Sequence, residues 1–242
     1  MTNVAKSRAE QIAEDLLEQI RRSQPGERFP AETEIASRLK VSRVTVREAL
    51  SALERKGLIT RRQGLGTFVN HNVVRIQTRL DESMEFLALI RAAGREASVA
   101  DARVRLAPAE AEAADRLGLR PGDQVVAAHK VFAADGVPVI HAVNIIPANL
   151  LRDASLHQTL AAKSLYAFLA EDCAQTVTYQ IADVRAMPAS PDVARSLGLA
   201  PGTPLLYIAE VGYSADDLPL FFSEEHYISD LIQFKILRKP TA

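Results

Sequence analysis

The opening segment of the chain spaces its apolar residues as an amphipathic helix does. Within residues 7–22, Ile12, Leu16 and Ile20 recur at every fourth position and would lie on one face. Pro25-Gly26 follows, and this pair is expected to end the helix. The pattern predicts a first helix that packs its apolar stripe against the rest of a domain.

Two more helices are expected in the next thirty or so positions. One covers residues 31–39 and starts at Pro30, because the missing N–H of proline costs nothing at the beginning of a helix. The other covers residues 43–56, with Ser42 as its N-cap and Gly57 as the left-handed residue that commonly ends a helix. The apolar face of this third helix is formed by Val46, Leu50 and Leu53.

Short runs of β type follow the third helix. They cover residues 58–62 and 66–70, with a hinge at Gln63-Gly64-Leu65-Gly66 between them, so they are expected to form a β-hairpin. Three helices followed by a hairpin, in this order, indicate a winged helix-turn-helix domain over residues 1–70.

The pattern changes after residue 70. Residues 71–78 show no strong periodicity and are interpreted as a linker, whereas residues 79–242 alternate strand-like runs with helical segments. This alternation is typical of an α+β domain with a mostly antiparallel sheet. The expected strands cover 98–106, 124–133, 138–147, 177–187, 204–214 and 219–228. The expected helices lie near 81–93, 108–118, 159–172 and 190–197.

The second domain repeats itself. The segment Leu117–Gly122 (LGLRPG) returns eighty residues later as Leu197–Gly202 (LGLAPG). Each copy is expected to follow a helix that begins at a proline, Pro108 in one case and Pro191 in the other, and to precede a strand. Pro-Gly turns can recur by chance, but the shared order of elements predicts two similar hairpin units in a pseudo-symmetric sheet.

Charge is distributed unevenly over an almost neutral chain. The formal net charge is −1, yet residues 1–70 carry 13 Lys and Arg against 9 Asp and Glu, while residues 71–242 carry 16 against 21. Residues 38–62 alone hold eight basic residues and two acidic ones. A local positive patch is typical of a polyanion site, usually nucleic acid; the alternative is a solvated helix face.

The composition also restricts the cellular setting. Hydrophobic residues make up 48% of the chain, yet no run approaches the about 20 apolar residues that a membrane span needs. Cys173 is the single cysteine, so an intrachain disulfide is excluded and a reducing compartment fits. No signal-peptide pattern is seen at the start. We therefore expect a cytoplasmic protein with no membrane partner.

The third helix carries the chemistry expected of a DNA-recognition helix. Arg43 and Arg47 are four residues apart and so share one face, opposite the apolar one. In a helix-turn-helix, the N-terminal end of the recognition helix meets base edges in the major groove. Arginine can donate two hydrogen bonds to guanine, and Thr45 can reach a phosphate or a thymine methyl group. These three residues are candidate DNA contacts.

The hairpin supplies further candidates. Gly64 has no side chain to hold the wing backbone away from DNA, and Arg61 and Arg62 stand beside it. The alternative is that all these arginines are ordinary surface residues and that Gly64 is a plain hairpin glycine. The occurrence of every part in the expected order favours DNA binding.

The segment FPAETEIASRLKVSRVTVREALSALERKGLITRRQGLGTFV, residues 29–69, closely resembles the DNA-binding domain of the GntR family. This resemblance implies base and phosphate contacts for Arg43, Arg47 and Gly64. Many members carry a DNA-contacting arginine where this chain has Thr33, so that contact is shortened to a hydroxyl or lost. The resemblance also implies a homodimer that reads a near-palindromic operator in double-stranded DNA.

The second domain resembles the HutC subfamily of GntR regulators. The likeness runs from about residue 80 to 238 and rests on the doubled Leu-Gly-Leu pattern, on SLYAFL and on SEEHYISDLIQFKILR. It implies a UTRA domain, which shares the fold of chorismate lyase and binds a small-molecule effector. An all-helical effector domain would lack the strand runs, and a fused aminotransferase would need far more chain.

A candidate effector pocket follows from the first hairpin. If Asp135-Gly136 forms its turn, Lys130 lies opposite His141 on one face of the sheet, with Phe132 and Val139 between them and the turn. A cation, an imidazole and an aromatic ring on one face could bind an anionic metabolite. The alternative is a lysine that faces solvent beside a histidine whose hydrogen bonds are satisfied.

The HutC resemblance implies more pocket residues. Ser83, Ser164 and Tyr166 match positions near the pocket of the subfamily, and three residues of the second hairpin occupy the equivalent place there, namely Ser223, Glu225 and Tyr227. Each of these can instead belong to the surface or the core. Related domains often carry arginines where Lys130 and Phe132 stand, and a glutamate in place of Ala142, so a sugar phosphate is not favoured as the effector.

We weighed two other functions. An enzyme is suggested by the likeness to a lyase fold, but fold does not carry function. The five histidines lack metal-ligand spacing, and no nucleophile elbow, phosphate loop or specific carboxylate pair occurs. We therefore expect no catalytic residue, metal or cofactor. A DNA-binding protein without a ligand would instead have a closed, apolar C-terminal interior.

The sequence thus predicts a transcription regulator, specifically a repressor, whose operator binding is controlled by a metabolite in the C-terminal domain. Effector binding is expected to shift the spacing or the mobility of the two DNA-binding heads of a dimer.

Overall fold

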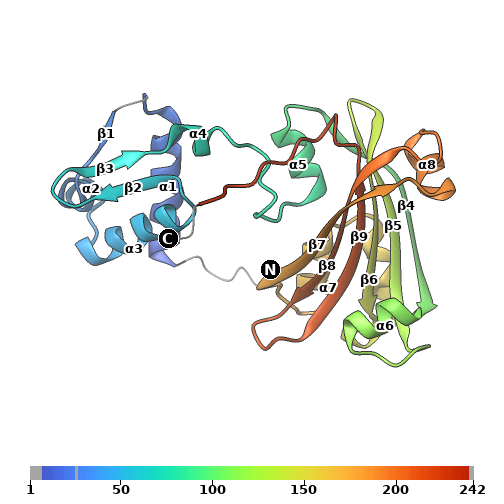
Figure 1. Cartoon of the computed structure of the whole chain (residues 1–242). Helices are drawn as coiled ribbons and strands as arrows, with labels where there is room; N and C mark the ends of the chain where they lie inside the picture. Colours follow the sequence, from blue (N-terminus) through green and yellow to red (C-terminus); the bar gives the residue numbers. More distant parts are fainter. Residues whose placement is uncertain (1–6, 25–26, 240–242) are drawn as a thin grey trace. The chain divides into compact units, whose positions relative to one another are not determined.

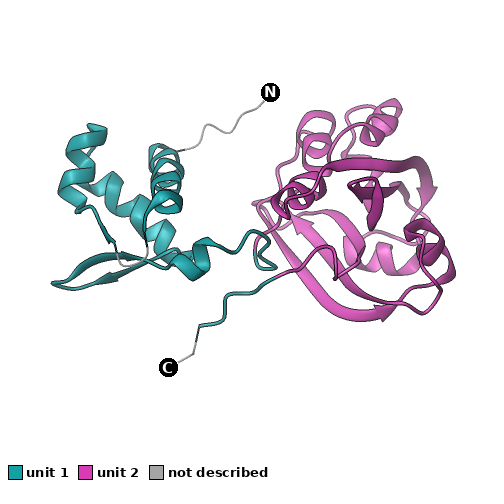
Figure 2. Ribbon diagram, turned by 90° about the horizontal axis from the view of Figure 1, so that it is seen from above, with its two compact units in different colours: residues 1–81, 235–242 teal, residues 82–234 magenta. Residues whose placement is uncertain are grey.

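The computed structural model describes residues 7–24 and 27–239, which form two compact units. Unit 1 contains residues 7–81 together with 235–239, and unit 2 contains Glu82–Phe234 (Figure 2). The chain therefore leaves unit 1 at Asp81 and returns to it at Lys235.

Three helices form most of unit 1: α1 (Arg8–Arg22), α2 (Glu32–Leu39) and α3 (Arg43–Arg55) (Figure 1). The Ser7 hydroxyl accepts a hydrogen bond from the backbone N–H of Glu10, whose carboxylate in turn accepts from the N–H of Ser7, so a capping box begins α1. The predicted apolar faces are confirmed. The helices bury Ile12, Leu16, Ile20, Ile35, Val46, Leu50 and Leu53 in one cluster.

A three-stranded antiparallel sheet completes the winged fold. β2 (Ile59–Arg62) and β3 (Gly66–Val69) form the predicted hairpin. β1 (Arg28–Phe29) pairs with the other edge of β3, so that β3 is the central strand. β1 was not predicted, because a strand of two residues shows no periodicity. Pro25 and Gly26, expected to end the first helix, lie outside the described residues; α1 is followed by Ser23 in extended conformation.

The segment after the wing is more ordered than a linker. It contains the short helix α4 (His71–Val74), and the guanidinium of Arg79 donates to the backbone carbonyl of Lys56 at 2.7 Å. Lys235 pairs with this segment, since its carbonyl accepts from the N–H of Leu80 at 2.9 Å and its N–H donates to the Thr78 carbonyl at 3.0 Å. The C-terminal tail, residues 235–239, is therefore part of unit 1.

Unit 2 is built on one curved antiparallel sheet with the strand order β4-β5-β6-β9-β8-β7 (Figure 1). All six strands lie close to the predicted ranges. They are β4 (Ala97–Pro108), β5 (Gln124–Ala134), β6 (Val137–Pro147), β7 (Tyr179–Pro188), β8 (Pro204–Tyr213) and β9 (Pro219–Tyr227). The two hairpins, β5-β6 and β8-β9, meet at the centre of the sheet through β6 and β9.

Helices cover both faces of this sheet. On one face, η2 (Ala154–Ala161) and α7 (Leu165–Asp172) pack on side chains that include Val126, Ile146 and Phe221. On the other face, α6 (Ala111–Leu117) packs on Phe222 and Tyr207, and α8 (Pro191–Leu197) packs on Leu205. α5 (Phe86–Ala92) precedes β4, and η1 (Ala148–Leu150) follows β6.

The internal repeat is real, but one detail of its prediction was wrong. Pro108 does not begin a helix; it is the last residue of β4, and α6 starts at Ala111. Its counterpart eighty residues later is Pro188, which ends β7. Pro191 does open α8, behind the N-cap Ser190. The second copy has two prolines close together, Pro188 and Pro191, and only Pro188 is equivalent to Pro108.

Candidate nucleic-acid interface and effector pocket

Arg43 and Arg47 project from unit 1 into solvent. Both lie on α3, opposite the fully buried Val46 and Leu50. α3 begins at an N-cap in which the Ser42 hydroxyl accepts from the backbone N–H of Thr45 at 3.1 Å. Because the cap fixes the first turn, it fixes where the side chain of Arg43 emerges.

Thr45 takes part in this cap. Its hydroxyl lies 2.8 Å from the hydroxyl of Ser42, and the residue is half-buried. Thr33 on α2 is exposed. Of the two threonines, Thr33 presents the more accessible hydroxyl, while Thr45 also supports the helix start.

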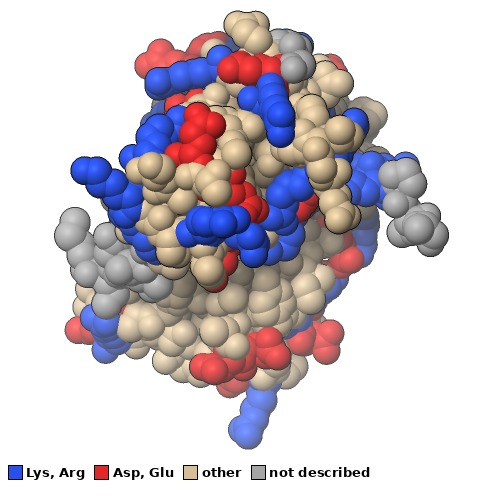
Figure 3. All heavy atoms as spheres, turned by 90° about the vertical axis from the view of Figure 1, so that its left-hand side faces the viewer, with Lys and Arg blue, Asp and Glu red and all other residues tan. Residues whose placement is uncertain are grey.

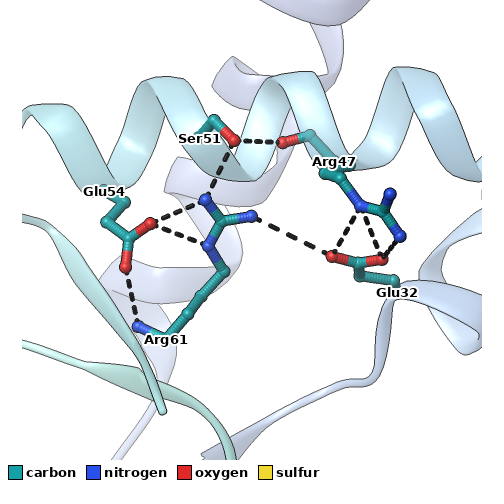
Figure 4. A network of polar contacts seen from close by, with 5 residues as sticks. All are labelled: Glu32, Arg47, Ser51, Glu54 and Arg61. Atoms are coloured by element: carbon teal, nitrogen blue, oxygen red, sulfur yellow. Dashed lines mark hydrogen bonds and ion pairs between the residues drawn. The ribbon is translucent and has the colours of Figure 1, made fainter. Parts of the chain in front are cut away.

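A polar network holds two of the candidate arginines (Figure 4). Arg47 donates to the carboxylate of Glu32 on α2, with Nη2 and Oε2 separated by 3.0 Å. Arg61 on β2 donates to Glu54 at 2.7 Å and to the hydroxyl of Ser51 at 2.9 Å. Hydrogen bonds from the backbone and side chain of Arg61 keep the pKa of Glu54 below its usual value. Arg61 thus ties the wing to the recognition helix.

The wing ends in an open glycine. Gly64 has φ +75°, a conformation that favours glycine, and a Cβ placed there would meet no atom within 4 Å. Arg62 lies beside it and is exposed, with its guanidinium carbon 5.3 Å from the centre of the Phe68 ring. The crest of the hairpin therefore offers bare backbone and a positioned cation.

Sequence reasoning missed an apolar contact residue on the same surface. Val44 follows Arg43 in the first turn of α3 and is 64% exposed, although valine usually avoids water. The available signal was its position, because residues of the first turn of a recognition helix face bases. In the view that faces unit 1, several Lys and Arg side chains lie across the surface, with acidic side chains among them (Figure 3).

The predicted pairing of Lys130 with His141 was wrong. Ala134 pairs with Val137 and Ala133 with Pro138, but a β-bulge then shifts the register, so that Lys130 pairs with Ala142. A shift by one residue turns every later side chain of one strand to the opposite face. Lys130 and His141 consequently lie on opposite faces of the sheet.

One of these faces, which we call the pocket face, carries Lys130, Asn144, Ser223, Glu225 and Tyr227. These residues are buried and lie at positions of β5, β6 and β9 that share one side of the sheet. The other, the histidine face, carries His129, His141 and His226. The sequence prediction therefore placed His141 on the wrong side, whereas Lys130, Ser223, Glu225 and Tyr227 share one face of the sheet.

The pocket face borders a cavity of about 250 Å³. Its wall includes Lys130 and Asn144 from the sheet, Phe86 and Arg91 from α5, and Ser164 at the start of α7. Lys130 is 6% exposed, and its ammonium group donates to the Lys163 carbonyl at 2.6 Å. Burial lowers its pKa. Among the described residues, no carboxylate lies within ion-pair distance of this ammonium group.

Asn144 was not foreseen. It is 3% exposed and lines the cavity. An amide in a cavity wall can donate and accept hydrogen bonds, so it is expected to meet a polar ligand. An asparagine in the middle of a strand is an unusual choice, and that was the available signal.

The remaining predicted pocket residues make hydrogen bonds in separate groups. The hydroxyls of Ser223 and Tyr227 both donate to the carboxylate of Glu225. Tyr166 on α7 lies 2.6 Å from the hydroxyl of Ser83, and burial raises the pKa of Tyr166 to about 12. The Ser164 hydroxyl caps α7 by accepting from the N–H of Ala167, which is a structural role at the edge of the cavity.

The histidine face has a separate cavity of about 830 Å³. The rings of His129 and His141 are 6.4 Å apart and those of His141 and His226 are 5.8 Å apart. The Nδ1 atoms of His141 and His226 are buried, with no hydrogen-bond partner among the described residues. Burial and the two neighbouring histidines lower the pKa of His141 to about 4, so its ring is neutral at pH 7.

The arginines of this second cavity are mostly neutralised. Arg103 pairs with Asp101 and Arg195 with Asp192, each at 2.9 Å, and all four residues are exposed or half-buried. The pocket face instead carries a buried ammonium group, that of Lys130, which has no ion pair among the described residues, and this makes that face the better candidate for an anionic ligand. No group of metal-ligating side chains and no helix long and apolar enough to span a membrane occurs in the described part of the chain.

Comparison with known proteins agrees with this division. Residues 8–69 match the family described as bacterial regulatory proteins, gntR family, and residues 92–233 match the UTRA domain family. A relative of similar length is the HTH-type transcriptional regulator Rv0792c of Mycobacterium tuberculosis, which is 30% identical over 240 residues covering 93% of this chain and 84% of the relative. The histidine utilization repressor of Pseudomonas putida is 32% identical over 76% of this chain and 72% of its own.

Solved structures show the same fold. A possible transcriptional regulator, YydK from Bacillus subtilis, superposes with a TM-score of 0.78 at 20% identity, covering 97% of this chain and all of that chain. PhnF from Mycobacterium smegmatis has a TM-score of 0.57 at 26% identity, covering 95% of this chain and all of that one. The relatives carry the names of transcription regulators, and their likeness extends through both units. The chain belongs to the GntR family of transcription regulators and joins a winged helix-turn-helix DNA-binding domain to a UTRA effector-binding domain.

Proposed function

We propose that this regulator is a repressor that binds a near-palindromic operator as a homodimer and releases it when an anionic small molecule enters the cavity on the pocket face. The observation that carries the proposal is Lys130, a buried ammonium group that lines a cavity and has no ion pair among the described residues. A buried cation of this kind is stabilised by an anion. The name of the Pseudomonas putida relative, a repressor, supports the direction of control.

The DNA contacts follow from unit 1. Arg43 and Arg47 read base edges or phosphates from α3, and Val44 packs on a thymine methyl group between them. Gly64 brings the wing backbone close to the duplex, and Arg62 contacts phosphate. Thr33 and Thr45 add hydroxyls, while Arg61 acts mainly by holding the wing against α3 through Glu54. This activity places the protein in the cytoplasm, with the DNA.

The second domain senses its ligand and does not convert it. The relatives reported above are named as transcription regulators, and the cavity on the pocket face is lined by a cation and an amide where an anion can be bound. A cavity with these polar groups in its wall also argues against a DNA-binding protein that has no ligand.

Selection of bound duplexes from a random pool tests the DNA half of this proposal. We expect enrichment of one sequence with two inverted half-sites, because a dimer repeats its recognition helix about one helical turn of DNA away. Sedimentation of the free protein should give twice the chain mass. Enrichment of a single, unrepeated half-site would contradict the dimer.

A thermal-shift screen against carboxylated and phosphorylated metabolites tests the effector half. A compound that raises Tm should also release the selected operator, and Lys130→Met should abolish both effects while leaving operator binding unchanged. A matched control is Lys163→Met, because Lys163 belongs to the wall of the same cavity but its charge is already paired with Glu171 and Asp172. A screen whose hits bind Lys130→Met as well as the natural chain would remove this cavity from the proposal.

A further inference from the structure

The pocket face holds a second charged group that the repressor proposal does not use. Glu210 on β8 and Glu225 on β9 lie on this face at diagonal cross-strand positions, since Glu225 pairs with Ile208 and Ser223 pairs with Glu210. Burial and the charge of Glu225 raise the pKa of Glu210. Two neighbouring carboxyl groups of this kind do not both ionise readily, so the pair retains a proton more strongly than an ordinary glutamate does.

This acid pair is built into a network. Glu225 is 5% exposed and accepts from the hydroxyls of Ser223 and Tyr227. Gln180 donates to Glu210 at 3.2 Å and to the hydroxyl of Tyr166 at 2.7 Å. Burial raises the pKa of both glutamates above the usual value. Within the described residues, no lysine or arginine makes an ion pair with either carboxyl group.

The position of the pair relative to Lys130 is set by the strand register. Lys130 pairs with Ala142, and Ala142 pairs with Glu225, so the three residues form one row across β5, β6 and β9. Two strand spacings separate the ends of this row by about 10 Å. Ala142, with its small side chain, lies between a buried cation and a carboxyl pair that form no ion pair with each other, and the cavity lined by Lys130 borders the same face.

Asn144 is a further polar group on this face. It is next but one to Ala142 on β6, directly opposite Ser223, and it lines the same cavity as Lys130. An amide can both donate and accept, so it suits a ligand that carries groups of both kinds.

We propose that the effector is amphoteric: its carboxylate or other anionic group binds Lys130, and a protonated nitrogen, as in an amine or an imidazolium, binds beside Glu225 and Glu210. This inference rests on the proposed function and names the chemical class that the effector site accepts. An incoming cation favours the ionised form of both carboxyl groups, so binding is expected to release a proton into solution. The other charged or titratable groups around the pair are Tyr227 on β9, Tyr166 on α7, Lys130 on β5 and Glu85 before α5.

Calorimetry with matched probes tests the proposal on the full chain. The probes are the ω-amino acids from 3-aminopropanoate to 6-aminohexanoate, together with the carboxylic acid and the alkylamine of the same length. We expect at least one amino acid to bind ten times more tightly than its matched acid or amine. Its binding heat at neutral pH should differ between phosphate and Tris buffers by the amount that release of up to one proton requires.

Glu225→Gln should remove the preference for the amino acid and the proton release, and should leave the affinity for the acid within about threefold of its original value. Glu224→Gln is the matched control, because Glu224 is adjacent in sequence but lies on the histidine face, where it accepts from Tyr207. Circular dichroism shows whether each variant is folded, and Glu210→Gln repeats the test if Glu225→Gln is not.

The inference is overturned if no amino acid binds more tightly than its matched acid, whether both bind or neither does. It is also overturned if Glu225→Gln and Glu224→Gln behave alike. Operator binding and its release by Lys130-dependent anions are measured on the same preparations, so that a failure of the amphoteric preference is distinguished from a failure of the repressor proposal.

Discussion

At the scale of single residues, the two arginines on the surface of α3 differ in how their side chains are held. Arg43 has an exposed side chain, whereas Arg47 is bound to Glu32, which also raises the pKa of the guanidinium group. An ion pair on a surface contributes little to stability, so Glu32 acts mainly by limiting the positions that Arg47 can take. The four-residue spacing predicted which way the arginines face, because that depends only on the helical repeat. It could not predict the ion pair with Glu32, which comes from another helix.

Arg43→Ala should weaken operator binding by about 1–3 kcal/mol and relax the preference at one base pair of each half-site. The reason is the loss of hydrogen bonds to a base edge. Fluorescence anisotropy with operator variants measures both effects. If this variant bound its operator as tightly as the natural chain, Arg43 would have no part in reading DNA.

Arg62→Ala is the companion change on the wing. It should weaken binding to all sequences by a similar factor and reduce the slope of log K against log salt by about 1, because a phosphate contact carries no sequence information. A change in base preference with an unaltered salt slope would mean that Arg62 contacts a base instead.

At the scale of elements, a single extra residue in the first hairpin of unit 2 decides what the effector pocket contains. The strand ranges were predicted well because alternation and turn residues mark them. The bulge between the pairs Ala133–Pro138 and Phe132–Ile140 has no comparable mark, and it moved His141 to the face opposite Lys130. The pocket residues taken from family likeness escaped this error, since they did not depend on counting along the hairpin.

Two glycines of unit 1 share a backbone conformation but differ in their surroundings. Gly57 after α3 and Gly64 on the wing have φ near +75°. A Cβ on Gly64 would meet open space, whereas a Cβ on Gly57 would overlap the side chain of Leu237 in the tail. Gly64→Ala should therefore lower the free energy of unfolding by about 1–2 kcal/mol, the usual cost of this conformation, and Gly57→Ala should lower it further.

Urea denaturation of the two variants measures this difference. Gly64→Ala should also weaken DNA binding, because it places a methyl group at the crest of the wing, while Gly57→Ala should act on stability first. Equal losses of stability in both variants would show that Leu237 does not pack on the end of α3.

At the scale of the whole molecule, unit 2 should respond to acid through its histidine face. The pKa of His141 is lowered to about 4 in the folded chain, against 6.5 for an ordinary histidine. The unfolded chain therefore takes up a proton first, and the stability that His141 contributes, complete above pH 6.5, is lost as the pH falls towards 4. Glu210 and Glu225 act in the opposite direction, because their raised pKa values make the folded chain bind protons more readily.

The test is the difference between His141→Phe and the natural chain, since the glutamates contribute equally to both. Tm measured from pH 7 to pH 4.5 should fall less in the variant. Identical pH profiles would show that His141 is protonated as easily in the folded chain as in the unfolded one. The carboxylates with lowered pKa values, such as Glu54, lose their contribution below this range.

Because the polypeptide returns to unit 1 at Lys235, the DNA-binding head cannot complete its packing early in synthesis. A ribosome delivers the helices of the DNA-binding head long before Lys235 and Leu237, which lie against Thr78 and Gly57 and complete its packing. The whole sensor must be translated between the two. The DNA-binding head therefore gains these contacts only after the effector-binding domain has been synthesised. A chain truncated within the effector-binding domain would have a DNA-binding head without them.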